Sequence, residues 1–224
     1  MTSRDTAAAA LRVDLGQLAP APDAFLGQCA ALHLVFIEQL TTAMASAPRV
    51  ADKDALAGVS GVVLRRYLAL VAEIERLQLD KSDVMQPHLE GVEEFERRTR
   101  GGEWYEQVAS AHVAIGFLTD FWMRLAQGLP NELRGRVTAA LSLDDLRAPV
   151  HRILERAIAA NPRLASRLAL WCRRLVGDTM LQARSALVRH DDRSKDKDEA
   201  QIEPVFTELI AEHTRRMDRL GLTA

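Results

Sequence analysis

Apolar residues recur at steps of three and four along most of the chain, and this spacing constrains the fold more than any other feature. The pattern is clearest over residues 23–47, 52–77, 104–125 and 162–187. Each stretch is long enough for about six helical turns and would place its apolar residues in one stripe. With 12 glycines, 8 prolines and 5% aromatic residues, the chain lacks the turns and strand formers of a sandwich or barrel. The sequence therefore predicts an all-α protein.

Shorter helices are expected between and after the long ones. Pro87 would open a short acidic helix, and Asn131 would begin a fourth helix of the bundle. Residues 142–158 would continue as helix, with a kink or restart at Pro149. Asp23 is the expected N-cap of the first long helix, because its carboxylate can accept hydrogen bonds from the first free amides.

The chain divides into a tail, a bundle and a last helix. Residues 1–22 are expected to form a flexible tail, 23–190 the helical bundle, 191–199 a charged linker, and 200–224 a C-terminal helix. Because about 20 residues cannot bury a core alone, the last helix should dock on the bundle. The predicted architecture is an up-and-down four-helix bundle with extra short helices and a docked C-terminal helix.

Composition and the two cysteines indicate an ordinary soluble protein. Hydrophobic residues make up 48% of the chain and charged residues 27%, and the net charge of -2 argues against a nucleic-acid surface over the whole chain. Cys29 and Cys172 lie far apart in apolar stretches and are expected to be buried reduced thiols. The apolar run at 7–11 is too short for an export signal, and no 18 uninterrupted apolar residues occur. We expect a cytoplasmic protein without a membrane partner.

Six short stretches carry a family resemblance. They are FERRT (95–99), DF (120–121), IAANP (158–162), LALWCRRLVG (168–177), HTRRM (213–217) and LGL (220–222). Together they resemble an actinobacterial ferritin-like family that is similar to the tRNA hydroxylase acting on 2-methylthio-isopentenyladenosine, a non-haem diiron enzyme. The resemblance covers about residues 25–222 and implies a ferritin-like bundle. The matching segments are mostly packing and surface positions, so they indicate a family and not a chemistry.

The diiron chemistry of such a fold needs ligands that this sequence lacks. Two metal ions in a bundle core require a Glu from each of two helices and a Glu-x-x-His pair from each of the other two. No acid stands three residues before any of the six histidines; those positions hold Ala30, Met85, Ala109, Ala148, Leu187 and Ile210. We therefore expect no cofactor, and iron or another metal enters only under an alternative hypothesis.

Other residue types occupy the positions at which the family pattern has its ligands. By this resemblance, His33 stands at the Glu position of the first helix, and Val63 and Arg66 stand at the Glu-x-x-His positions of the second. Asp120 keeps the acid of the third helix. An arginine at a former ligand position would repel a dication. These four residues are the predicted remains of the metal site.

The fourth helix departs furthest from the family pattern. Its acid-x-x-His pair would fall at 143–146, where Asp144 and Asp145 stand without a histidine. We predict that Arg66 reaches into the core and pairs with Asp120, or with an acid near Asp144 and Asp145, because a guanidinium satisfies a carboxylate with two parallel hydrogen bonds.

Each conspicuous polar or aromatic residue also has an ordinary structural interpretation. His33 can be a core histidine held by one hydrogen bond, and Asp120 can belong to a structural ion pair. Trp104 and Trp122 are expected to fill the core, and the acids at 90–96 to form a solvated helix face.

Arginines are concentrated in one part of the chain. Residues 147–190 hold nine arginines against one Glu and one Asp, whereas residues 73–103 hold nine acids and five bases. Arginine suits phosphate and carboxylate recognition, so this region is a candidate anion-binding surface. Its candidate residues are Arg163, Arg167, Arg173 and Arg174. Alternatively, the two regions complement each other with neighbouring helices or in a homo-oligomer, such as a dimer.

Three functional hypotheses remain open. The first, which we favour, is a bundle that has lost its diiron site and acts by binding or assembly. The second is a remodelled metal-dependent hydroxylase of the tRNA-modifying type that uses His33, Asp120, Asp144 or Asp145. The third is a tRNA- or anion-binding module that uses the arginine-rich helix. The sequence contains no P-loop, no Gly-x-Ser-x-Gly elbow and no dinucleotide-binding fingerprint.

Overall fold

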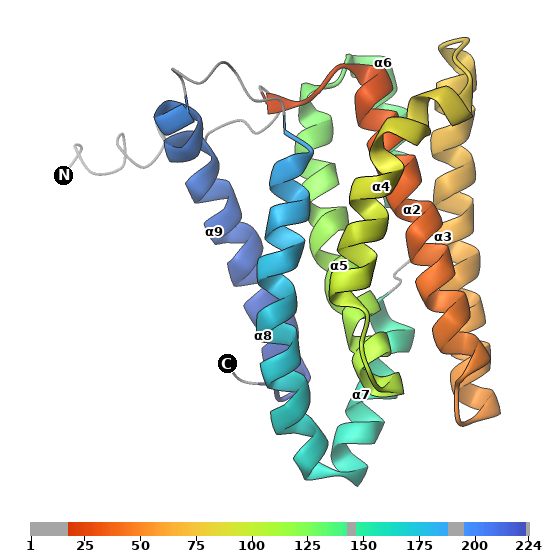
Figure 1. The fold of residues 1–224 in the computed structure, drawn as a ribbon, viewed down its shortest axis with the longest axis vertical. Helices are drawn as coiled ribbons and strands as arrows, with labels where there is room; N and C mark the ends of the chain where they lie inside the picture. The colour runs from red at the N-terminus through yellow and green to blue at the C-terminus, as the bar shows by residue number, and fades with distance from the viewer. Residues whose placement is uncertain (1–17, 143–146, 188–194, 223–224) are drawn as a thin grey trace.

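The computed structural model describes residues 18–142, 147–187 and 195–222, with the backbone alone at 195–201. These residues form eight α-helices and one short 3-10 helix, and no strand occurs among them (Figure 1). The helices are α2 (Pro22–Ala45), α3 (Val50–Arg76), α4 (Lys81–Thr99), α5 (Trp104–Leu125), η2 (Ala126–Gly128), α6 (Asn131–Leu141), α7 (Arg147–Ala160), α8 (Pro162–Ser185) and α9 (Lys195–Arg219). The predicted all-α fold is confirmed.

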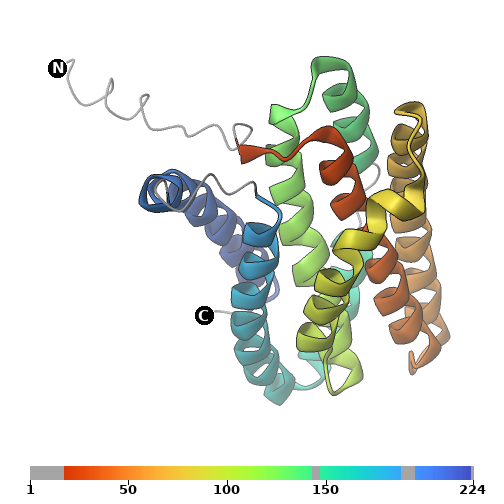
Figure 2. The ribbon, with the colours of Figure 1, turned by 45° about the horizontal axis from the view of Figure 1, so that its top comes forward.

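Four helices close a ring around one core. α2 packs against α3 and α5, and α7 packs against the same two helices from the opposite side. The additional helices lie outside this ring: α4 covers α2, α6 packs on α3, and α8 covers α5. α9 packs on α5 and α8, at the edge of the molecule opposite α3 (Figures 1 and 2). This is a four-helix bundle with extra helices and a docked C-terminal helix.

Aromatic side chains fill the centre of the bundle. Six phenylalanines are among the largest fully buried side chains: Phe25, Phe36, Phe95, Phe117, Phe121 and Phe206. Trp122 is 3% exposed and meets the Phe25 ring edge-on at a centroid distance of 4.9 Å. Trp104 is half-buried, and its indole N–H donates to the Ala43 carbonyl oxygen at 2.7 Å. Both tryptophans thus serve packing between helices.

Helix α4 begins six residues before the predicted start at Pro87. The Asp80 carboxylate accepts hydrogen bonds from the Ser82 and Asp83 amides at 2.7 and 3.1 Å, which caps a helix starting at Lys81. Pro87 therefore lies inside the helix. The prediction was wrong because it gave more weight to proline than to the capping aspartate.

Three other boundaries also differ from expectation or refine it. In α2, Pro22 holds the first helical position and Asp23 lies in the first turn, so Asp23 is not the cap. The described part of α7 runs from Arg147 to Ala160 without interruption, so Pro149 lies in the helix as described and not between two helices. The described part of α9 begins at Lys195, inside the predicted linker.

Helices α2 and α3 are each long and apolar enough to cross a membrane, judged by length and composition alone. In α2, 61% of the most apolar window is buried inside the protein, as expected for the central helix of a bundle. In α3 the buried share is 33%. Because core helices of soluble proteins pass the same test, this finding is weak evidence for a membrane span.

Gly27 allows α2 and α4 to approach closely, and this gives a stability test. A Cβ atom at this position would lie 2.2 Å from the Val84 carbonyl oxygen, which is backbone and cannot swing away. Gly27→Ala should lower the free energy of unfolding by about 2–3 kcal/mol, measured in denaturant. The matched control is Gly91→Ala in α4, where a Cβ would meet nothing within 4 Å, and it should stabilise by about 0.5–1 kcal/mol. Equal unfolding midpoints for both variants would contradict this close packing.

Candidate functional site

A buried polar cluster lies inside the helix ring and includes residues that the sequence resemblance predicts at former ligand positions. His33 of α2 is 3% exposed and Arg66 of α3 is 4% exposed. Arg66 Nη1 donates to the Thr119 hydroxyl of α5 at 3.3 Å, and His33 Nδ1–H donates to the Cys29 carbonyl oxygen at 2.7 Å. Val63, one turn before Arg66, is fully buried and apolar. The cluster therefore joins three helices of the ring.

Arg66 sets the electrostatic character of this cluster. Burial lowers the pKa of His33 to about 4, against the raising effect of its bond to the Cys29 carbonyl, and the Arg66 charge lowers it further. The ring is therefore neutral at neutral pH. Burial also raises the pKa of the Cys29 thiol far above its usual value, so this thiol stays protonated. The charge that remains in the cluster is that of Arg66.

Asp120 lies next to Thr119 in sequence but is engaged elsewhere. Its carboxylate forms an ion pair with Nη1 of Arg216 from α9, whose side chain is 6% exposed. Successive residues of a helix point about 100° apart, so Thr119 faces α3 while Asp120 faces α9. The predicted pair between Arg66 and Asp120 is wrong. The other predicted partners, Asp144 and Asp145, lie outside the described residues.

Two further buried carboxylates on α3 are bound by arginines from other helices. Asp52 is 1% exposed and pairs with Arg156 of α7. Glu73 is 4% exposed and accepts a bond from Arg136 of α6 at 2.7 Å. Neither pair was predicted from the sequence. The spacing of the charged residues could have indicated them: positions 52, 66 and 73 are separated by multiples of seven residues and therefore share one face of α3.

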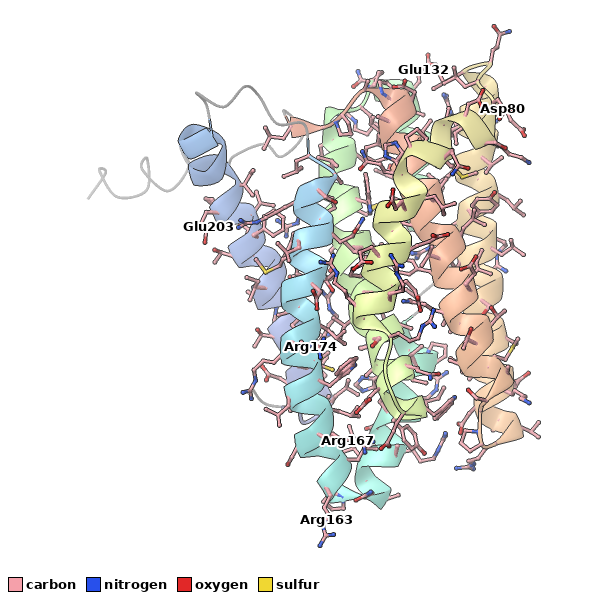
Figure 3. All side chains as sticks on the ribbon, viewed as in Figure 1. Asp80, Glu132, Arg163, Arg167, Arg174 and Glu203 are labelled. Carbon is pink, nitrogen blue, oxygen red and sulfur yellow. The ribbon has the colours of Figure 1, made fainter. Side chains whose placement is uncertain are left out.

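The arginines of α8 are the predicted anion-binding residues, and part of their charge is engaged. Arg167 bonds Glu103 at 2.6 Å and approaches Glu106 at 3.4 Å, while Arg174 lies over the Trp171 ring at 5.4 Å. Arg163 lies near the start of α8 and points away from the bundle (Figure 3). Arg173 is exposed. The helix thus presents less available positive charge than its arginine count indicates.

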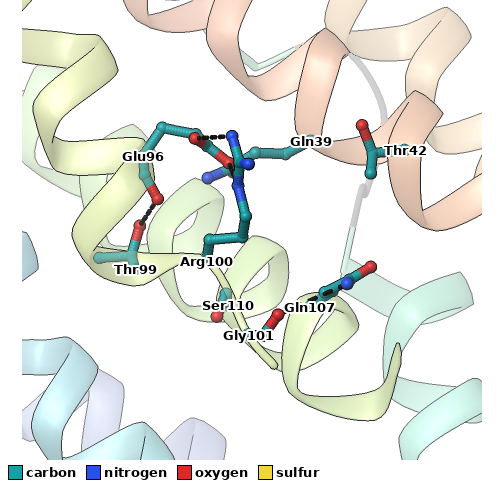
Figure 4. Close-up of a pocket in the computed structure, with 8 residues that line it drawn as sticks. All are labelled: Gln39, Thr42, Glu96, Thr99, Arg100, Gly101, Gln107 and Ser110. Atoms are coloured by element: carbon teal, nitrogen blue, oxygen red, sulfur yellow. Dashed lines mark hydrogen bonds and ion pairs between the residues drawn. The ribbon is translucent and has the colours of Figure 1, made fainter. Parts of the chain in front are cut away.

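A small polar pocket between α2, α4 and α5 is a packing feature. Its volume of about 20 Å³ accommodates one water molecule. Gln39 Oε1 and Gln107 Oε1 are buried there without a partner among the described residues, whereas Arg100 is held by Glu96 at 2.6 Å (Figure 4). The pocket is too small for a ligand.

The chain was compared with models of known protein families. The family described as a ferritin-like domain of actinomycetes matches residues 22–195, which is more than half of the chain. The chain belongs to this family. No curated protein matches it. The matched region of the ferritin-like domain includes the whole four-helix ring and α8.

The ferritin-like fold implies a pair of metal ions in the core, and the described core residues do not fit them. Within the described ranges, no group of three or more His, Cys, Asp or Glu side chains could hold a metal ion. Val63 offers no donor atom, and the Arg66 guanidinium would repel a dication in a medium that screens charge poorly. No chemical step through such a metal pair follows from these residues.

The ion pair between α5 and α9 can be tested by a double-mutant cycle. Arg216→Leu and Asp120→Leu should each destabilise this ferritin-like domain, because each strands one charge. The double variant should lose about 1–2 kcal/mol less than the sum of the single losses, measured by denaturant unfolding. The matched cycle of Arg66→Leu with Asp120→Leu should be additive within about 0.5 kcal/mol. If Asp120 were coupled to Arg66 and not to Arg216, the assignment of Arg216 as the partner of Asp120 would be wrong.

Proposed function

We propose that this chain is a ferritin-like protein that works without a diiron centre and acts by binding and self-assembly. The observation that supports the proposal is the buried Arg66, which donates to Thr119 and which the sequence resemblance places at a former ligand position. A guanidinium keeps its charge at all accessible pH values, so the cluster does not become a dication site on deprotonation.

The absence of metal is tested by elemental analysis of protein from iron-supplemented cells. We expect far less than one iron per chain, because Arg66 opposes a dication and the neutral His33 supplies at most one ligand. A diiron protein of the same fold, grown and purified in parallel, serves as the positive control. Near-stoichiometric iron in the wild-type protein would contradict the proposal and favour the remodelled tRNA-modifying hydroxylase.

The link to the tRNA hydroxylase and the tRNA-binding hypothesis are weaker proposals. The ion pairs of Arg167 with Glu103 and Glu106 reduce the positive potential of α8, although Arg163 and Arg173 remain at the surface. A tRNA partner would be held by phosphate contacts, and its affinity would fall steeply with added salt. Cytoplasmic localisation likewise stays a prediction.

The outer face of α3 supports self-assembly. Leu64 is 44% exposed, Leu68 is 54% exposed, and Val50 near the start of the helix is 84% exposed. Gly61 lies on the same face, and a Cβ atom there would meet only Arg65 Nη1, at 3.8 Å, among the described residues. α3 lies at an outer edge of the bundle in both views (Figures 1 and 2). The leucine side chains project from this face beside Gly61, where the absence of a side chain leaves a depression.

A second copy of this chain fits this face in antiparallel orientation. With a twofold axis between positions 64 and 65, Leu64 meets Leu64 of the other copy, and Leu68 lies opposite Gly61 of the other copy. The two Arg65 side chains lie at the rim of this contact, where they can extend into water. The face is therefore complementary in shape to itself.

Charges at the two ends of the same face support this register. Positions that sum to 129 lie at the same level along the two helices, so Lys53 and Asp54 of one copy lie at the level of Arg76 and Glu75 of the other. Helical spacing places Lys53 on the side of Glu75, and Asp54 on the side of Arg76. Opposite charges thus approach at both ends, and rim charges of this kind select partner and register.

The proposed dimer is tested by sedimentation velocity at increasing protein concentration. The wild type should form a concentration-dependent dimer, because a single helix pair makes a small interface. Leu64→Glu and Leu68→Glu should each shift the protein to monomer without loss of helical content. The control is Leu170→Glu on α8, where the leucine is 65% exposed, and this variant should dimerise like the wild type. A monomeric wild type, or equal dimerisation of all variants, would contradict the α3 interface.

A further inference from the structure

A solvent-open cavity of about 460 Å³ lies between α5, α7 and α9, apart from the cluster around Arg66. Its polar lining side chains come from all three helices: His112 from α5, Arg147 and His151 from α7, and Glu212, Arg216 and Arg219 from α9. Three guanidinium groups, two imidazoles and one carboxylate therefore surround the space. Such a lining suits a polar anion and not an apolar ligand.

Two of these side chains are more than nine-tenths buried and have polar atoms that no described residue satisfies. His112 is 5% exposed, and neither ring nitrogen has a hydrogen-bond partner within the described ranges. Arg216 is 6% exposed; its Nη1 binds Asp120, but its Nε and Nη2 have no such partner. Buried polar atoms left unpaired cost stability, and these atoms belong to side chains that line an open cavity, although the atoms themselves are shielded from solvent.

The electrostatic environment is that of an anion site. Burial lowers the pKa of His112 to about 3, and the charges of Arg216, His151, His213 and Arg147 lower it further. The neutral ring can still donate one hydrogen bond. Glu212, the one acid of the lining, is held on its other side by Arg215 at 2.6 Å.

We propose that this cavity binds a phosphate group, either free or as the head of a small organic phosphate. Guanidinium and imidazole groups line this cavity from three helices, and a phosphate presents three or four oxygens to such donors where a carboxylate presents two. The volume exceeds that of phosphate alone and leaves room for a small attached group. The site does not depend on whether the bundle core holds a metal.

Isothermal titration calorimetry with inorganic phosphate and with ribose 5-phosphate tests this site. The matched variants are Arg219→Gln in the cavity lining and Arg163→Gln on α8, which change the net charge equally. Arg219→Gln should weaken binding about tenfold, whereas Arg163→Gln should change it less than about twofold. Tighter binding of ribose 5-phosphate identifies an organic phosphate as the ligand class, and equal binding identifies the free ion.

Arg216 is unsuitable as the single test because its loss also strands Asp120. A second readout therefore follows the His112 ring proton by NMR during the phosphate titration. We expect a saturable shift of this signal in the wild type that Arg219→Gln moves to higher phosphate concentration. Absence of saturable heat and of any His112 shift would overturn the proposal. An equal loss of affinity in Arg163→Gln would do the same, because the binding would then reflect overall charge.

Discussion

Charged residues buried along one face of α3 determine how the helices fit together. Asp52, Arg66 and Glu73 each lie within an otherwise apolar surface and each contact a different helix. Among the described residues of other helices, they bond to Arg156 of α7, Thr119 of α5 and Arg136 of α6, respectively. Stranding one buried charge costs several kcal/mol, so a slip of α3 by one turn would be opposed at three places at once. Apolar packing alone tolerates such slips far better.

The residues that hold the bundle together differ from those that would decide what its core can bind. The ring of α2, α3, α5 and α7 depends on stripes of apolar residues, and these are intact. The chemistry of a diiron bundle depends on a few polar positions inside that ring. Arg66, inside that ring, bonds Thr119 of α5, and its charge would oppose a metal ion placed beside it. One buried position can therefore change what a bundle core binds without altering the apolar stripes that form the bundle.

The positions of the helices could be predicted from the sequence, because burial of one side of a helix makes apolar residues recur every three to four positions. The partner of Asp120 could not be predicted from the sequence, because it depends on which helix packs against each face of α5. Arg216 stands 96 residues further along the chain, and no local pattern connects the two. The early start of α4 was readable, since Asp80 stands two and three residues before the amides that it caps. Asp144 and Asp145 lie outside the described residues.

Positive charge counted along a sequence differs from positive charge available in a fold. The arginine-rich stretch at 147–190 has a large excess of cations, yet Arg156 neutralises Asp52 and Arg167 lies between Glu103 and Glu106. Ion pairing of this kind is decided by helices that approach from distant parts of the chain. The cationic cavity forms where Arg216 and Arg219 of α9, from outside that stretch, line the same space as Arg147 and His151 of α7. A ligand site in such a bundle therefore follows from what remains after the helices have satisfied one another, and not from where arginines are densest.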